Sequence, residues 1–185
     1  MKPLCIVTIA TDKDQKYLDK LKESVTTFHP DIPLVVIGDK EIKESGDTEF
    51  IKRATPSVVN LLLKEYERVI RLPVKSEIIA NLSPLLQGDF DIYTSHEKTQ
   101  EEAQKSPYSI WFIAPIEYLR SDFLIAKNNS LVAHWQKMCY QPYFKNYPRG
   151  ETDMLNILLH YSNHAEIKIR LFPKLELLKY IKIHE

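Results

Sequence analysis

The sequence predicts an α/β fold, built on a mixed, mainly parallel sheet with helices on both faces. The chain opens with a near-continuous apolar run at residues 4–10, typical of a strand buried on both faces. An amphipathic helical pattern and a second short apolar run, residues 34–37, follow it. This β–helix–β order implies parallel pairing with a right-handed crossover, which is the opening of a doubly wound sheet.

The elements of the first half follow from spacing and from turn residues. Apolar residues between positions 17 and 28 recur at helical spacing, and two prolines end that helix. Thr55 and Pro56 predict the next helix start, because threonine caps free amides and proline fits the first helical position. We expect this helix to run to about residue 66, and residues 69–72 to form the third strand.

The second half predicts further strands and two helices. Apolar runs predict strands at residues 90–94, 109–114 and 123–126, with mixed directions. The polar segment 96–107 is expected to be a surface loop or helix. Helical patterns follow near residues 130 and 152, and residues 167–171 and 181–183 are predicted to be the closing strands.

Composition restricts the class of protein. A chain of 185 residues that is 44% hydrophobic can form one sizeable core, which favours a single domain over residues 1–185. The 25 basic and 25 acidic residues cancel, so no global field favours nucleic acid. Cys5 and Cys139 lie far apart, as expected for buried free thiols. No stretch is long and apolar enough for a membrane span, and we expect a cytoplasmic protein.

The segment 67–85 has the frame of a known signature. Residues 72–76, Leu-Pro-Val-Lys-Ser, stand where a hydrophobic-D-x-D-small sequence would end a strand, and residues 81–85, Asn-Leu-Ser-Pro-Leu, match the d-L-s-x-L loop that follows. Residues 5–11, 119–127, 151–156 and 181–184 match further motifs in the expected order. On these motifs the chain resembles the GT-A glycosyltransferases, a nucleotide-diphospho-sugar transferase superfamily, over roughly residues 4–184.

The resemblance implies a UDP- or GDP-sugar donor and a saccharide or glycan acceptor. Mn²⁺ or Mg²⁺ is usual in the family, bound by the two aspartates of the signature. Here Pro73 and Lys75 occupy those positions, and proline cannot bind a cation while lysine repels one, so we expect no metal ligands and no required cofactor. Lys75 could instead place its ammonium group against the diphosphate; the alternative is an ordinary exposed lysine.

Other candidate residues follow from their alignment with the family. For Asp39, Lys52 and His184 the structural alternatives are a loop acid, a solvated charge pair and an exposed terminal histidine. His160 and His164 have the spacing of metal ligands, but without a third ligand they are expected to be surface residues. The nucleotide-sugar-binding candidates are Thr8, Ala10, Thr11, Asp39, Lys52, Lys75, Ser76, Asp122 and His184.

Glu151 and Asp153 are the predicted catalytic residues. Both stand at a predicted helix start, where the helix dipole favours carboxylates for structural reasons alone. The family match implies instead that Asp153 binds the transferred sugar or acts on the acceptor hydroxyl.

Two functions remain open from the sequence. The first is a glycosyltransferase that handles the diphosphate without a metal ion. The second is a catalytically inactive GT-A-like domain that binds a nucleotide sugar, a glycan or a protein.

Overall fold

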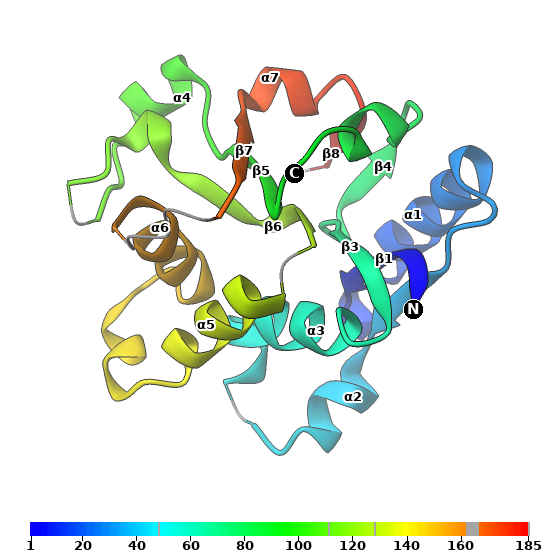
Figure 1. Ribbon diagram of the computed structural model, residues 1–185, viewed down its shortest axis with the longest axis horizontal. Helices are drawn as coiled ribbons and strands as arrows, with labels where there is room; N and C mark the ends of the chain where they lie inside the picture. The colour runs from blue at the N-terminus through cyan, green and yellow to red at the C-terminus, as the bar shows by residue number, and fades with distance from the viewer. Residues whose placement is uncertain (48, 111, 128, 162–166, 185) are drawn as a thin grey trace.

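The computed structural model of the protein describes residues 1–47, 49–110, 112–127, 129–161 and 167–184. Six of the described strands form one sheet in the order β2-β1-β3-β6-β5-β7, and β4 pairs with β8 (Figure 1). The strands are β1 (Lys2–Ile9), β2 (Leu34–Ile37), β3 (Tyr66–Arg71), β4 (Ser76–Ile78), β5 (Ile92–His96), β6 (Leu119–Ala126), β7 (Ile169–Phe172) and β8 (Ile181–Ile183). The helices are α1 (Gln15–Phe28), α2 (Asp39–Glu44), α3 (Ala54–Leu62), α4 (Gln100–Lys105), α5 (Asn129–Cys139), α6 (Glu151–Tyr161) and α7 (Lys174–Leu177).

The sheet is mixed and mainly parallel, as the sequence predicts. β1 pairs in parallel with β2 and β3, and β5 pairs in parallel with β7. β6 runs antiparallel to both of its neighbours, β3 and β5. The carboxyl ends of β1, β2, β3, β5 and β7 therefore meet at one edge, where β6 begins.

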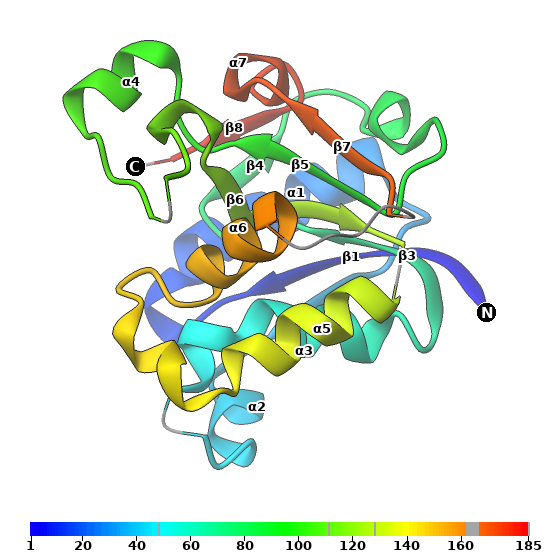
Figure 2. The same cartoon turned by 60° about the vertical axis from the view of Figure 1, so that its left-hand side comes forward.

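Helices cover both faces of the sheet, because successive strand residues point to opposite sides. On one face, Cys5 and Val69 pack in a core with Trp135 of α5 and Leu155 of α6. On the other face, strand residues such as Ile6 and Ile70 pack with α1, α7 and the β4–β8 pair. Figure 2 shows α3 and α5 on one side of the sheet and α7 on the other.

The predicted helix start at Thr55 and Pro56 is wrong in its details. A 3-10 turn at Phe50–Arg53 precedes α3, so Thr55 and Pro56 are the second and third residues of the helix. The amide of Thr55 is capped from outside, by the Glu151 carboxylate. The helix also ends at Leu62 rather than near residue 66, because Tyr66 already pairs with Lys2 in the sheet.

The strand predicted at residues 109–114 is absent from the described part of that segment. Phe112 has φ 63°, a left-handed backbone conformation that a strand does not allow, and its side chain is fully exposed. Strands β5 and β6 pair directly with each other instead. The polar segment 96–107 contains α4, one of the two predicted alternatives.

Among the residues that the structure describes, no helix is long and apolar enough to cross a bilayer. His160 lies on α6, whereas His164 falls outside the described residues.

Candidate functional site

A polar cavity of about 500 Å³ opens at the sheet edge where the parallel strands end. Arg71, the last residue of β3, pairs with Leu124 of β6, so the start of β6 extends beyond β3. Open α/β sheets bind ligands in this position. The side chains that line the cavity belong to Glu97, Lys98, Glu102, Ser106, Arg120, Ser121, Asp122, Arg149, Thr152, Lys174 and Ile183.

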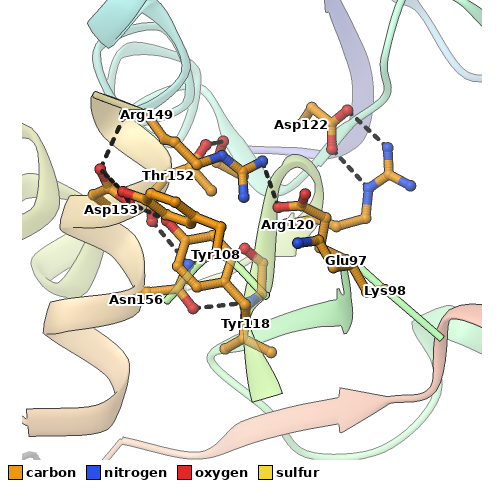
Figure 3. A network of polar contacts seen from close by, with 12 residues as sticks. Glu97, Lys98, Tyr108, Tyr118, Arg120, Asp122, Arg149, Thr152, Asp153 and Asn156 are labelled. Carbon is orange, nitrogen blue, oxygen red and sulfur yellow. Dashed lines mark hydrogen bonds and ion pairs between the residues drawn. The ribbon is translucent and has the colours of Figure 1, made fainter. Parts of the chain in front are cut away.

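The cavity wall contains cation–carboxylate pairs. Arg120 on β6 donates a fork of two hydrogen bonds to Asp122, each 2.8 Å long (Figure 3). The Asp122 side chain is 46% exposed. Desolvation at the cavity wall would raise its pKa, but the hydrogen bonds and charge of Arg120 hold that pKa below its usual range. The carboxylate is thus an anion at neutral pH.

Two further pairs join segments that are distant in sequence. Arg149 Nη2 lies 2.6 Å from Glu97 Oε2, and Lys174 Nζ lies 2.6 Å from Glu102 Oε1. Lys98, also in the wall, donates to the carbonyl of Ser106. The first pair joins the residues after β5 to the turn before α6, and the second joins α7 to α4. The Lys98 contact joins the residues after β5 to the residue that follows α4.

Asp153 lies beside the cavity in a dense set of hydrogen bonds. Its carboxylate is fully buried and accepts hydrogen bonds from the hydroxyls of Tyr108 and Tyr118 and from the amide of Arg149. Burial, together with the nearby Asp153 charge, raises the pKa of Tyr108 to about 12 and raises that of Tyr118 as well. Both tyrosines therefore remain neutral donors.

The Arg149 side chain is held between these tyrosines and Glu97. Its guanidinium lies 4.9 Å from the Tyr118 ring centre and 5.5 Å from that of Tyr108. The next residue, Gly150, has φ 52°, and a Cβ there would lie 2.8 Å from the carbonyl oxygen of Lys52. Glycine thus lets the chain turn sharply into α6 against Lys52.

Asn156 and Thr152 fasten α6 to the start of β6. The buried Asn156 amide donates to the Leu119 carbonyl at 2.9 Å and accepts from the Leu119 amide at 2.8 Å. The hydroxyls of Thr152 and Ser121 lie 2.6 Å apart. Because both elements contribute to the cavity wall, these bonds fix one side of the site.

Glu151 links α6 to α3. Its Oε2 accepts the Thr55 amide at 2.9 Å. Burial raises the pKa of Glu151 to about 7, against opposing contributions from Thr55 and the positive charge of Arg71. Arg71 is itself 6% exposed, and its Nε has no hydrogen-bond partner among the described residues.

The structure brings some of the predicted site residues to the cavity. Asp122 lines it, and Glu151 and Asp153 flank the lining residue Thr152 on the first turn of α6. Their catalytic and binding roles stay predictions, although the hydrogen bonds to Thr55 and Arg149 amides show that both acids also have structural roles.

Apart from Asp122, none of the nine predicted nucleotide-binding residues lines the cavity. Thr8 is buried and donates to the Leu72 carbonyl at 3.0 Å, and Ala10 follows β1. Thr11 bonds to Asp14, while the Asp39 carboxylate accepts the amide of Asp12 at 2.6 Å. The Lys52 side chain is exposed and pairs with Glu49. The hydrogen bond of Asp39 to the Asp12 amide matches the loop-acid alternative.

Lys75, Ser76 and His184 meet at the β4–β8 pair. Lys75 is exposed, with Nζ 5.3 Å from the Tyr17 ring centre, and its carbonyl accepts the His184 amide at 2.8 Å. Ser76 is buried, donates to the Pro73 carbonyl and pairs with Ile183, which lines the cavity. These residues therefore adjoin the cavity wall through β8.

The turn at residues 72–75 does not fit a divalent cation. Pro73 offers no side-chain oxygen, and the Lys75 ammonium would repel a metal ion. Across the described ranges, no group of three or more His, Cys, Asp or Glu side chains is arranged to hold one.

Sequence reasoning missed most of the cavity wall. Glu97, Lys98, Arg149 and Lys174 lie in loops or at element ends outside the matched motifs. One wall residue does lie in a matched motif: Arg120 belongs to the segment 119–127, at a position where the family usually has an asparagine.

No protein-family model matches the sequence, and no curated protein matches it. Solved structures do match. A glycosyltransferase involved in glycosylation of the major capsid of PBCV-1 has a TM-score of 0.61 at 10% identity, over 92% of this chain and 82% of that one. The galactosyltransferase LgtC, solved with donor and acceptor sugar analogs, gives 0.53 at 17% identity, over 90% and 72%. GlyE of Streptococcus pneumoniae gives 0.58 at 10% identity, over 93% of this chain and 45% of GlyE.

At such identities the likeness concerns the fold alone, and it covers at least 90% of this chain. The protein therefore has a GT-A-type glycosyltransferase fold.

Proposed function

We propose that the protein transfers a sugar from a nucleotide-diphosphate sugar, UDP- or GDP-linked, to a saccharide or glycan acceptor. The observation that carries the proposal is the polar cavity at the carboxyl edge of a GT-A-type sheet. The structural neighbours are glycosyltransferases, which supports glycosyl transfer as the class of reaction.

The proposed transfer breaks the bond between the anomeric carbon and the diphosphate and forms a bond to an acceptor oxygen. The leaving diphosphate gains negative charge, which fixed cations stabilise. Lys75 remains the sequence-based candidate for that role. Glu151, with a pKa raised to about 7, and Asp153 are the candidates for binding the sugar or accepting the acceptor proton.

Binding and donor hydrolysis with and without Mn²⁺ test this proposal. We expect UDP- or GDP-sugars to bind without metal, to be hydrolysed slowly, and to be transferred when the correct glycan is added. Absence of nucleotide binding under both conditions would contradict it and favour a domain that binds a glycan or a protein. Tight binding without any turnover would identify an inactive nucleotide-sugar-binding domain.

A further inference from the structure

We propose that Arg120, Arg149 and Lys174 together bind the donor's diphosphate in place of a divalent cation, and that Glu97 competes with the diphosphate for Arg149. The proposal rests on the proposed function, which supplies the ligand. It follows from the charge, the burial and the orientation of the side chains that line the cavity.

The cationic side chains of the cavity wall suit a diphosphate. A diphosphate carries at least two negative charges, and the turn at Pro73 and Lys75 cannot hold the divalent cation that would neutralise them. Three cationic side chains from β6, the residues before α6 and the start of α7 instead line a single cavity of about 500 Å³. Guanidinium groups suit this ligand because their fork matches two phosphate oxygens.

Burial also supports the proposal, because in two of the ion pairs the cation is less exposed to solvent than its carboxylate partner. The Arg120 side chain is 9% exposed, whereas that of its partner Asp122 is 46% exposed. The Lys174 side chain is 20% exposed and that of Glu102 is 46% exposed. A carboxylate that already faces water loses little when an anion takes its place, whereas the buried cation needs a counter-charge at all times.

The Arg149 side chain is also held in place before a ligand binds. The Arg149 guanidinium lies against the rings of Tyr108 and Tyr118, and its backbone amide is bound to Asp153. Figure 3 shows its side chain directed toward Glu97. A side chain held in this way loses little conformational entropy when it binds a ligand.

Glu97 occupies the place that the ligand would take. It pairs with Arg149 at 2.6 Å, and its negative charge also acts on Arg120. One carboxylate thus partly neutralises both arginines, as a phosphate group would. A phosphate group on Arg149 would lie beside the Glu97 carboxylate and compete with it for the guanidinium, so Glu97 lowers the affinity for the anion.

The test uses inorganic pyrophosphate, UDP and uridine as probes, titrated calorimetrically in EDTA. Arg149→Gln and Lys174→Gln should each weaken pyrophosphate and UDP binding by ~10- to 100-fold, the range of one hydrogen bond to a charged group, and leave uridine binding unchanged. Glu97→Gln should strengthen pyrophosphate binding several-fold. Arg170→Gln is the matched control, because Arg170 also lies over a tyrosine ring, that of Tyr93, but outside the cavity.

Melting temperatures show whether each variant is folded, and Lys174→Gln keeps the test valid if Arg149→Gln does not fold. The proposal is overturned if Arg149→Gln and Lys174→Gln bind pyrophosphate as Arg170→Gln does, or if Glu97→Gln weakens binding. These titrations do not require turnover. A protein that fails to hydrolyse or transfer any sugar, yet loses pyrophosphate binding in Lys174→Gln, would contradict the proposed function and leave the anion site intact.

Discussion

The buried carboxylate of Asp153 accepts a hydrogen bond from the hydroxyl of Tyr118, the residue that precedes β6. It accepts a second hydrogen bond from the hydroxyl of Tyr108. Tyr108 lies near the start of the loop between α4 and β6, and Tyr118 lies at its end. One acid on α6 thus holds both ends of a loop beside the cavity. The arrangement gives Asp153 a structural role that is independent of any catalytic one.

Asp153→Asn should therefore lower stability, and its effect on activity tests the catalytic role. The side-chain N–H group of asparagine would face the tyrosine hydroxyls and the Arg149 amide, which are hydrogen-bond donors to Asp153. We therefore expect the free energy of unfolding to fall by about 1–3 kcal/mol. If Asp153 also contacts the sugar or acceptor, turnover should fall by ~10²-fold or more at temperatures where the variant is folded. Tyr108→Phe, which removes one donor and keeps the carboxylate, is the control. Normal turnover by a folded Asp153→Asn protein would restrict Asp153 to its structural role.

Gly150→Ala should destabilise the start of α6. Its backbone has φ 52°, and the new Cβ would lie 2.8 Å from the Lys52 carbonyl oxygen. Strain of this kind costs about 1–3 kcal/mol, measured as a fall in the free energy of unfolding, and the clash adds to it. Gly46→Ala is a matched control, since Gly46 has φ 65° but nothing within 4 Å of the added Cβ. Equal losses in the two variants would show that the contact with Lys52 is unimportant.

Glu151 predicts a pH dependence of stability. In the folded protein burial raises its pKa to about 7, from an ordinary value of 4.5. Between these pH values the folded state binds a proton that the unfolded state has released, so the free energy of unfolding falls as the pH rises through this window. Asp122, whose pKa is lowered, contributes with the opposite sign and only at lower pH.

Urea unfolding of the wild type and Glu151→Gln between pH 5 and 8 measures this effect. Glutamine keeps an oxygen that can accept the Thr55 amide but does not titrate, so the stability of the wild type relative to the variant should decline as the pH rises. A difference that stays constant over this range would show that Glu151 ionises at its ordinary pKa.

The fold could be predicted from sequence wherever burial leaves a regular pattern. The run that became β1 is apolar because this strand lies inside the parallel sheet, whereas β2 is a partly buried edge strand, and spacing alone identified α1 between them. The run at residues 109–114 misled the prediction because apolar composition does not reveal that Phe112 is exposed. In the structure Phe112 has a left-handed backbone that a strand does not allow, and β5 pairs directly with β6.

The candidate site was less predictable, since its contacts join residues that are distant in sequence. Lys174 and Glu102 are 72 positions apart, and no sequence pattern pairs the two residues. The acids of α6 could be found because a helix start has a local pattern. Charge pairs across a cavity have no such pattern, and they depend on how loops after different strands come together.

Lys75→Ala tests the remaining cation at the altered signature. If the exposed Lys75 ammonium contacts the diphosphate, its loss should weaken sugar-nucleotide binding by ~1.5–3 kcal/mol, the range of a charge-assisted contact. Binding of the free nucleoside should weaken far less, as judged by calorimetry on both ligands. Equal losses would assign Lys75 a role outside phosphate binding, such as its contact with Tyr17.

Restoring both acids at the signature gives the converse experiment. Pro73→Asp combined with Lys75→Asp places two hard carboxylates at the end of β3, next to the cavity wall formed by β8, and removes the charge that repels a cation. If this turn is a metal site that lost its ligands, the double variant should acquire manganese-dependent nucleotide binding, while Pro73→Ala with Lys75→Ala should not. Both variants free the amide at position 73, so their comparison isolates the carboxylates from the loss of proline. Titration that shows no metal dependence in the double aspartate variant would mean that the other ligands are also missing, or that residues 72–76 do not correspond to the metal-binding signature.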